Sequence, residues 1–190
     1  MSKEYIEDQH FDKVDFRQEA LAHGEYEHCH FSYCDFSNVD LSGIGFMECS
    51  FVGCNLSLVK LGSVGFRDVR FKDCKMLGLY FDHCNPFGFS VSFEGCVLTH
   101  SSFYQMKLKK IVFKGSKLQE VDFTECDLSG AIFLDCDLVG ATFEQTILEK
   151  ADFRSAYNYS IDPTLNRIKK AKFSLVGVGG LLDKFGIEIS

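Results

Sequence analysis

The chain has 190 residues, a formal net charge of −7 at pH 7 and a hydrophobic fraction of 46%, which is most simply one folded domain. This negative net charge excludes the class of nucleic-acid-binding proteins whose whole chain is basic. No apolar run reaches the roughly 18 residues of a membrane span, and the polar start, Met1 to Tyr5, is not a signal peptide. We therefore expect a cytoplasmic protein with no membrane contact and no direct binding to nucleic acid.

A fixed period of five residues dominates the chain. Residues 1–10 are predicted to be a short polar lead-in that covers the open end of the first repeat. Large apolar residues then return every five positions, first from Phe11 to Phe81 and again from Phe93 to Phe153. Neither the helical period of 3.6 nor the strand period of 2 gives this spacing, so the chain is predicted to be a repeat architecture. Sixteen of the 20 phenylalanines lie at these centres, which explains the aromatic content without an aromatic cofactor site.

Two pentads show the repeat most clearly, Val39-Asp40-Leu41-Ser42-Gly43 and Cys126-Asp127-Leu128-Ser129-Gly130. The pattern over residues 11–155 resembles the pentapeptide-repeat family, whose loose motif is Ala-Asp/Asn-Leu/Phe-Ser/Thr-Gly. The resemblance implies an all-β solenoid, a right-handed quadrilateral parallel β-helix with a short C-terminal helical cap. It also implies four pentads per coil, with the centre and the residue two places before it pointing inward. Residues 20 apart should then stack, as the spacing from Phe11 to Phe31 and on to Phe51 allows.

The nine cysteines all lie two places before a centre, if Pro86 is counted as the centre that follows Cys84. That inward position predicts buried thiols that form no disulfide. In His28-Cys29-His30 the cysteine would face inward and both histidines outward, which makes a poor metal site. The chain shows no nucleophile elbow, phosphate loop or paired-carboxylate signature. We therefore predict no catalytic, cofactor-binding or metal-binding residues, and no enzyme.

The period breaks at residues 85–92, where Asn85, Pro86 and Gly88 are turn signals and the centres shift by two residues. We interpret the break as a small bulge or loop that absorbs two residues while the columns keep their register. Either it only bends the stack, or it is a protruding loop that contacts a partner.

Residues 156–190 are predicted to be a C-terminal cap and dimerisation segment. Asp162-Pro163 is a helix-start signal, Gly186 could end a second helix, and residues 187–189 read as a short strand. The segment resembles the tails of the Qnr quinolone-resistance proteins and the microcin immunity protein, which implies that it covers the solenoid end and pairs two monomers. A cap without dimerisation is the alternative. The candidate dimer contacts are Leu181, Leu182, Phe185, Ile187 and Ile189.

The same resemblance implies a function, because Qnr-type and microcin-immunity-type proteins protect topoisomerases and Qnr-type proteins are thought to imitate DNA. Residues 118–149 carry eight acids and no base. They span about 1.6 coils, or ~8 Å, so their charge per length at least equals that of duplex DNA, which is one per ~1.7 Å. The candidate partner-binding acids are Glu120, Asp122, Glu125, Asp127, Asp135, Asp137 and Glu144. The expected partner is DNA gyrase or topoisomerase IV, with resistance to a quinolone or a similar poison as the outcome.

Two features depart from that expectation. Residues 60–117 form a basic belt with ten Lys and Arg residues against four acids. The two-residue insertion at Pro86 is also smaller than the loops with which Qnr proteins engage gyrase. The alternative is a general interaction scaffold that binds another partner through the basic belt or the Pro86 loop. A solvated acidic face that only keeps the protein soluble is a further reading of residues 118–149.

Overall fold

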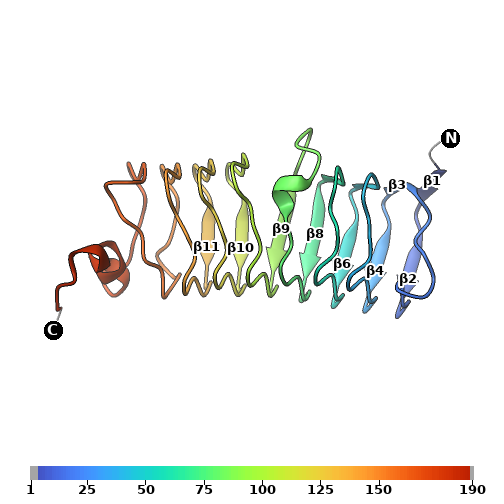
Figure 1. Ribbon diagram of the computed structural model, residues 1–190, viewed down its shortest axis with the longest axis horizontal. Helices are drawn as coiled ribbons and strands as arrows, with labels where there is room; N and C mark the ends of the chain where they lie inside the picture. The colour runs from blue at the N-terminus through green and yellow to red at the C-terminus, as the bar shows by residue number, and fades with distance from the viewer. Residues whose placement is uncertain (1–3, 189–190) are drawn as a thin grey trace. The chain divides into compact units, whose positions relative to one another are not determined.

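The structure is a computed structural model that describes residues 4–188. The chain divides into two compact units, one that ends at Leu98 and one that begins at Thr99. Unit 1 contains two parallel sheets (Figure 1). The first sheet is formed by β1 (Glu4–Glu7), β3 (Gly24–Glu27), β5 (Gly45–Met47) and β7 (Gly65–Arg67). The second is formed in unit 1 by β2 (His10–Asp12), β4 (His30–Ser32), β6 (Ser50–Val52), β8 (Val69–Lys72) and β9 (Val91–Glu94).

The remaining elements are short. Unit 1 also contains the 3-10 helix η1 (Phe81–His83). In unit 2, β10 (Val112–Lys114) pairs in parallel with β11 (Ile132–Leu134). Two 3-10 helices, η2 (Gly177–Leu181) and η3 (Asp183–Phe185), follow near the C-terminus. On the other sides of the coils, isolated parallel bridges take the place of strands.

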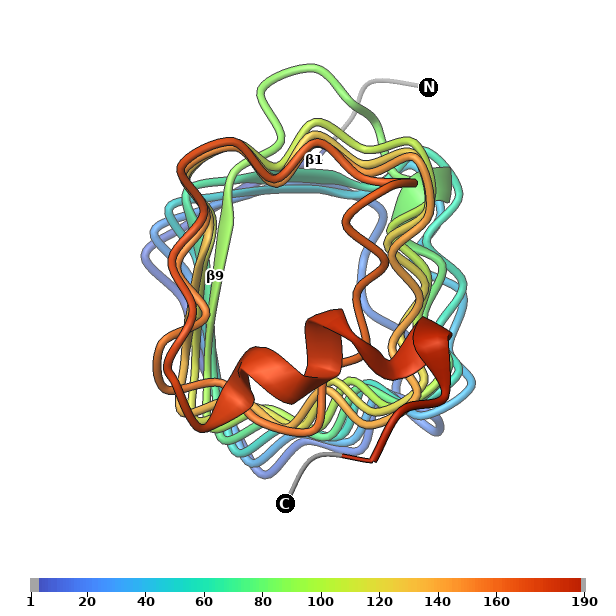
Figure 2. The same cartoon turned by 90° about the vertical axis from the view of Figure 1, so that its left-hand side faces the viewer.

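Except at the break in the period, the strand register shows 20 residues per coil. Phe11 pairs with Phe31, and Phe31 with Phe51; in unit 2, Phe113 pairs with Phe133. Four pentads therefore complete one turn, and the coils have four sides when viewed along their axis (Figure 2). The predicted fold, a right-handed quadrilateral β-helix, is confirmed.

The pentad motif is explained by how each corner is made. The residue two places after a centre has a positive φ, for example 58° at Leu58 and 60° at Lys110, a conformation that glycine adopts without steric cost. The aspartate before the centre stabilises the same turn. Asp127 Oδ1, for instance, accepts the backbone N–H of Ser129 at 3.1 Å. The Asp and Gly positions of the motif are thus turn positions.

Stacked rings fill the interior of each unit. In unit 1 the ring centroids of Phe31 and Phe51 lie 4.6 Å apart, with planes inclined by 8°. In unit 2 the Phe133 and Phe153 centroids lie 4.6 Å apart. Neighbouring columns meet edge to face, as at Phe113 and Phe123, so the aromatic residues contact each other both along and across the stack.

The cysteines combine packing with a weak hydrogen bond. All nine are buried and free, as predicted. Several donate from Sγ to the carbonyl of the previous coil's centre, such as Cys54 to Phe31 O and Cys74 to Phe51 O, both at 3.3 Å. At the equivalent position Thr146 Oγ1 donates to Phe123 O at 2.9 Å. The inward position therefore favours small residues that can also satisfy this carbonyl.

Burial should make these thiols unreactive. It raises the pKa of Cys49 to about 12 and that of Cys136 to about 11, so these two thiols carry almost no thiolate at pH 8. Hydrogen bonding with Cys74 lowers the pKa of Cys54 and that of Cys96, and these two are protected because they are buried. We expect no reaction of the native protein with an aromatic disulfide reagent at pH 8, and reaction of all nine cysteines once denaturant is added. Rapid reaction of any cysteine in the native state would contradict this packing.

The break in the period is absorbed as predicted. Val69 pairs with Val91 and Phe71 with Phe93, so the register increases from 20 to 22 while the Phe column continues. The two extra residues form a loop that projects from its coil (Figures 1 and 2). Pro86 lies at the position of a predicted centre but is exposed. Phe89 contacts the core instead, with its ring edge-on to Phe66 and Phe81.

Both ends of the repeat region differ from the prediction. β1 lies within the expected lead-in, and Ile6 pairs with Tyr26, so the first coil begins before Phe11. At the other end the register continues to Lys172, which bridges Asp152, and Phe173 stacks on Phe153 at 5.3 Å. Asp162 accepts the N–H of Thr164 in a turn and begins no helix. Residues 187 and 188 are not in a strand, and Ile189 lies outside the described residues.

Candidate functional site

The four sides of unit 2 are defined by its bridges. One side contains the column Ser102, Asp122, Thr142, and the next contains Lys107, Asp127, Ile147, Arg167. The third contains β10 and β11 together with Asp152 and Lys172, and the fourth contains Lys117, Asp137, Tyr157. The candidate acids of residues 118–149 therefore lie on all four sides. The linear charge density calculated from the sequence is divided among surfaces that face in different directions.

Three of the predicted acids have a structural role at the turns. Asp122, Asp127 and Asp137 each accept the backbone N–H of the residue two places later. The side chain of Asp127 is only 18% exposed and lies 3.2 Å from the ammonium of Lys109. Partial burial by itself would raise the pKa of Asp127, but the bonds from Ser129 and Lys109 outweigh it and lower the pKa.

Asp137 is held in a similar way. It accepts hydrogen bonds from Gln119 Nε2 at 2.7 Å and from Asn158 Nδ2 at 2.8 Å. These bonds outweigh the effect of burial and lower its pKa. Asp127 and Asp137 are therefore poorly placed to contact a partner, because both oxygens of each are already occupied.

The remaining predicted acids are exposed: Glu120, Glu125, Asp135 and Glu144. Glu125 is oriented by Gln105 Nε2 at 2.8 Å and Tyr104 Oη at 3.4 Å, and Glu120 lies 3.3 Å from His100 Nδ1. Glu125 and Glu144 share one side with Asp122. We call this surface the acidic side of unit 2, and define it as residues 101–105, 121–125 and 141–145. It contains no Lys or Arg.

The adjacent side has the opposite charge. We call it the basic side of unit 2, and define it as residues 106–110, 126–130, 146–150 and 166–170. Its bases are Lys107, Lys109, Lys110, Lys150, Arg167, Lys169 and Lys170. Its two acids are both paired, Asp127 with Lys109 and Glu149 with Arg167. The basic belt noted in the sequence ended at Lys117 and therefore omitted four bases of this side, Lys150, Arg167, Lys169 and Lys170.

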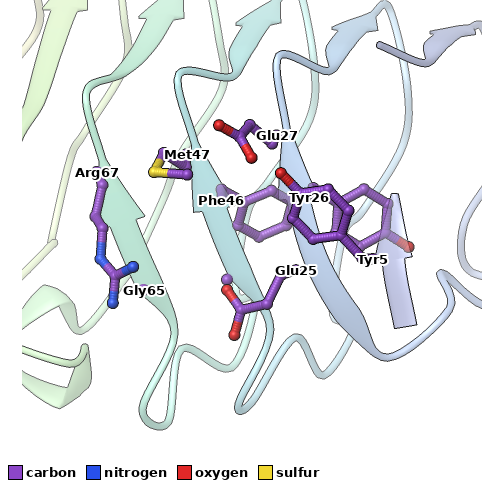
Figure 3. A pocket seen from close by; sticks show the side chains of 9 residues that line it. Tyr5, Glu25, Tyr26, Glu27, Phe46, Met47, Gly65 and Arg67 are labelled. Carbon is purple, nitrogen blue, oxygen red and sulfur yellow. The ribbon is translucent and has the colours of Figure 1, made fainter. Parts of the chain in front are cut away.

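Unit 1 contains a second acidic surface, which was not among the predicted sites. The outer face of the β1-β3-β5-β7 sheet and the corner beside it carry Glu7, Asp8, Glu25, Glu27 and Glu48. Figure 3 shows the middle of this face, with Glu25 and, farther along the sheet, Arg67. The carboxylate of Glu25 lies against Gly45, where a Cβ would overlap it. The cavity among these residues encloses about 30 Å³, which is room for about two water molecules. It is too small for an organic substrate.

A wider polar depression lies on the neighbouring side of unit 1. It measures about 550 Å³ and is lined mainly by His30, Ser50, Asp68, Arg70 and Ser92. His30 Nδ1 lies 2.7 Å from Ser50 Oγ, and the ring of His10 stacks on the His30 ring with the centroids 4.8 Å apart. In the range 4–188, no group of three or more His, Cys, Asp or Glu residues could hold a metal ion.

The C-terminal segment has a different exposed surface from the one predicted. Leu181 and Leu182 are half-buried, whereas Phe185 and Ile187 are exposed. The most exposed apolar side chains are Leu175 at 93% and Val176 at 97%. Nothing in their sequence spacing distinguished them, because they lie in the turn before η2.

Two glycines allow this segment to lie against the last coil. Ile161 N–H donates to Gly180 O at 2.8 Å. A Cβ on Gly180 would overlap the backbone of Tyr159, and a Cβ on Gly177 would overlap its side chain. Within residues 4–188, no helix is long and apolar enough to cross a bilayer.

Comparisons with known proteins agree with this fold. A family model described as a pentapeptide repeat region matches residues 89–176, and one described as pentapeptide repeats (8 copies) matches residues 27–62. Together these matches cover more than half of the chain. No curated protein sequence matches it.

Several solved structures are similar. One is QnrB1, a plasmid-mediated fluoroquinolone resistance protein, with 19% identity, a TM-score of 0.45 and coverage of 99% of this chain and 98% of that one. Another is HetL, a pentapeptide repeat protein involved in heterocyst differentiation regulation in Nostoc sp., with 12% identity, a TM-score of 0.38 and coverage of 90% and 87%. A third comes from the Arabidopsis thaliana thylakoid lumen, with 20% identity, a TM-score of 0.21 and coverage of 67% and 63%.

Proposed function

The chain belongs to the pentapeptide-repeat family, and from that premise we propose that it is a non-catalytic interaction protein that imitates DNA. The proposed partner is a type II topoisomerase, DNA gyrase or topoisomerase IV. The proposed outcome is protection against a quinolone or a similar poison. The proposed contact surface is the acidic side of unit 2.

The observation that carries this proposal is the separation of charge in unit 2. Asp122, Glu125 and Glu144 share a side that contains no base. They lie in two consecutive coils, which together occupy ~10 Å along the axis, so this part of the side carries about one charge per 3 Å. One strand of duplex DNA carries one per ~3.4 Å. A protein groove that binds phosphates would therefore meet a similar charge density.

We further propose that two copies pair through their C-terminal segments. Leu175 and Val176 are almost fully exposed in the described chain, and adjacent large apolar side chains of this kind are typical of an interface. A two-fold pairing would bring the same surface of each copy together.

The alternative function is a general interaction scaffold. It is favoured by Phe87, which is 76% exposed at the tip of the loop in unit 1. The guanidinium carbon of Arg67 lies 5.7 Å from the centre of its ring. An aromatic residue displayed in this way suits a protein contact that does not depend on the acidic side.

A supercoiling assay tests the first proposal. The protein is titrated against DNA gyrase, with and without a quinolone, and compared with a variant carrying Glu125→Lys and Glu144→Lys. These exposed glutamates are better probes than the turn aspartates, whose replacement would also disturb the fold. We expect the wild type to inhibit the enzyme or protect it, and the variant to need about tenfold more protein or more.

The matched control carries Asp12→Lys and Glu19→Lys, two exposed acids of unit 1 that change the net charge by the same amount. The control should behave like the wild type. An equal loss in both variants would indicate an effect of net charge alone. No effect of the wild type at excess would rule out gyrase, and the same comparison would then be made with topoisomerase IV.

A further inference from the structure

The basic side of unit 2 is a surface that the proposed function does not use. Its bases come from three of its four coils, and residues 20 apart are stacked in columns. One column lies at a corner and consists of Lys110, Gly130, Lys150 and Lys170. Their backbones are linked in order, because Lys110 N–H donates to Ser129 O and Lys150 N–H donates to Lys169 O, in the next coil in each case.

The three lysines of this column extend in the same direction. Their φ angles are 60° at Lys110, 61° at Lys150 and 61° at Lys170. The backbone conformation is therefore the same at all three, and the Cα–Cβ bonds point in the same direction. The side chains are exposed, and the ion pairs of this side involve Lys109 and Arg167 instead. From the first coil of the column to the last, the charge is positive at Lys110, absent at Gly130, and positive at Lys150 and Lys170.

A corner column of unit 1 has the opposite pattern in the same order. It borders the β1-β3-β5-β7 sheet and consists of Asp8, His28, Glu48 and Asp68. Their φ angles lie between 52° and 54°, close to those of the lysine column. Counting only Asp and Glu, the column reads negative, none, negative, negative. Because both columns have the same coil spacing, all three acids can face all three lysines when two copies lie parallel.

We propose that the basic side of unit 2 binds the acidic sheet of unit 1 in a second copy of this chain, along these two corners. Asp8 would then face Lys110, Glu48 would face Lys150 and Asp68 would face Lys170, with Gly130 opposite His28. An antiparallel alignment would form only two of the three pairs, because Lys150 would face His28 and Glu48 would face Gly130. The contact is heterologous, so the copy at each end of an assembly keeps one free surface and the assembly grows with concentration.

Other polyanions fit this side less well. The four pentads of the basic side contain no Phe, Tyr or Trp, so it lacks the stacking platform of single-strand binders. Its exposed apolar content is also too small for a membrane anchor. The acidic surface of a second copy, by contrast, has matching spacing and is always present at the same concentration.

Sedimentation velocity tests the proposal. The full chain carries Leu175→Ser and Val176→Ser throughout, so that C-terminal pairing does not contribute. We expect weak, concentration-dependent association in about 10 mM salt, where the Debye length is about 30 Å, and its loss in about 1 M salt, where it is about 3 Å. Absence of association at low salt would overturn the proposal, as would association that persists at high salt.

Charge reversal makes the test specific. One variant carries Lys110→Glu, Lys150→Glu and Lys170→Glu, and the other carries Asp8→Lys, Glu48→Lys and Asp68→Lys. Glu and Lys both occur at such corners elsewhere, as at Glu120 and Lys13, so both variants should fold, which circular dichroism checks. Each alone should associate at least tenfold more weakly, and an equimolar mixture of the two should regain a complex. A control with Lys13→Glu, Lys60→Glu and Lys114→Glu should keep its association.

Failure of the mixture to associate, or a loss in the control as large as in the lysine variant, would overturn the proposal. Tighter binding of duplex DNA than of a second copy would overturn it too. None of these substitutions touches Glu125 or Glu144, so a negative result here and a negative supercoiling assay remain distinguishable.

Discussion

Phe123→Ala is expected to lower the free energy of unfolding by about 3–5 kcal/mol. The Phe123 side chain is completely buried in unit 2. Its ring stacks between Phe103 at 5.4 Å and Phe143 at 5.2 Å. In a solenoid each coil is stabilised mainly by its neighbours, so a cavity in a middle coil of the unit weakens the contacts on both of its sides.

Urea unfolding followed by far-ultraviolet circular dichroism measures this effect, since the chain contains no tryptophan. The control is Phe87→Ala at the exposed loop, for which we expect a change within about 0.5 kcal/mol. A loss below about 1 kcal/mol for Phe123→Ala would show that the ring column is not the main source of stability in unit 2.

Replacing both Leu175 and Val176 by Ser is expected to convert a dimer to a monomer. The two side chains are 93% and 97% exposed in the described chain. Burying an apolar side chain of this size contributes about 1.5–3 kcal/mol, and a two-fold interface would bury each of them twice. The dissociation constant should therefore increase by about 100-fold or more.

Size-exclusion chromatography with light scattering measures the change. Leu165→Ser is the matched control, because Leu165 is 55% exposed in unit 2 but lies outside the C-terminal segment. The control should remain dimeric. A wild type that is monomeric at all concentrations would leave the segment as a cap without a pairing function, and a double variant that stays dimeric would place the interface elsewhere.

The fold could be predicted from the sequence because every pentad places one large apolar side chain in the interior. This requirement repeats in each coil and leaves a period of five in the sequence. The period of five did not predict where the repeat region begins and ends. Ile6 lies among Tyr5, Glu4 and Glu7, so its role as a centre was hidden by polar neighbours. At the other end, the centre expected 20 residues after Leu138 is the polar Asn158. The apolar period is therefore interrupted there, although the coils continue to Phe173.

The candidate site was predicted less well, because charges were counted along the chain. Two residues five positions apart lie on adjacent sides of a coil, whereas residues 20 apart lie on the same side. Sorting the charges by a period of 20 would have separated Glu125 from Asp127, and would have grouped Lys110 with Lys150 and Lys170. The sequence also did not reveal that Asp127 and Asp137 use their oxygens in turns.

Competition with DNA tests the proposed function most directly. A labelled duplex is bound to the topoisomerase at low salt, and the full-length protein is added in increasing amounts. If the acidic side of unit 2 imitates DNA, the wild type displaces the duplex, displacement weakens as salt is added, and the Glu125→Lys and Glu144→Lys variant displaces it at least tenfold less effectively. A ternary complex of enzyme, duplex and protein, or displacement that the variant retains in full, would contradict DNA imitation by this surface.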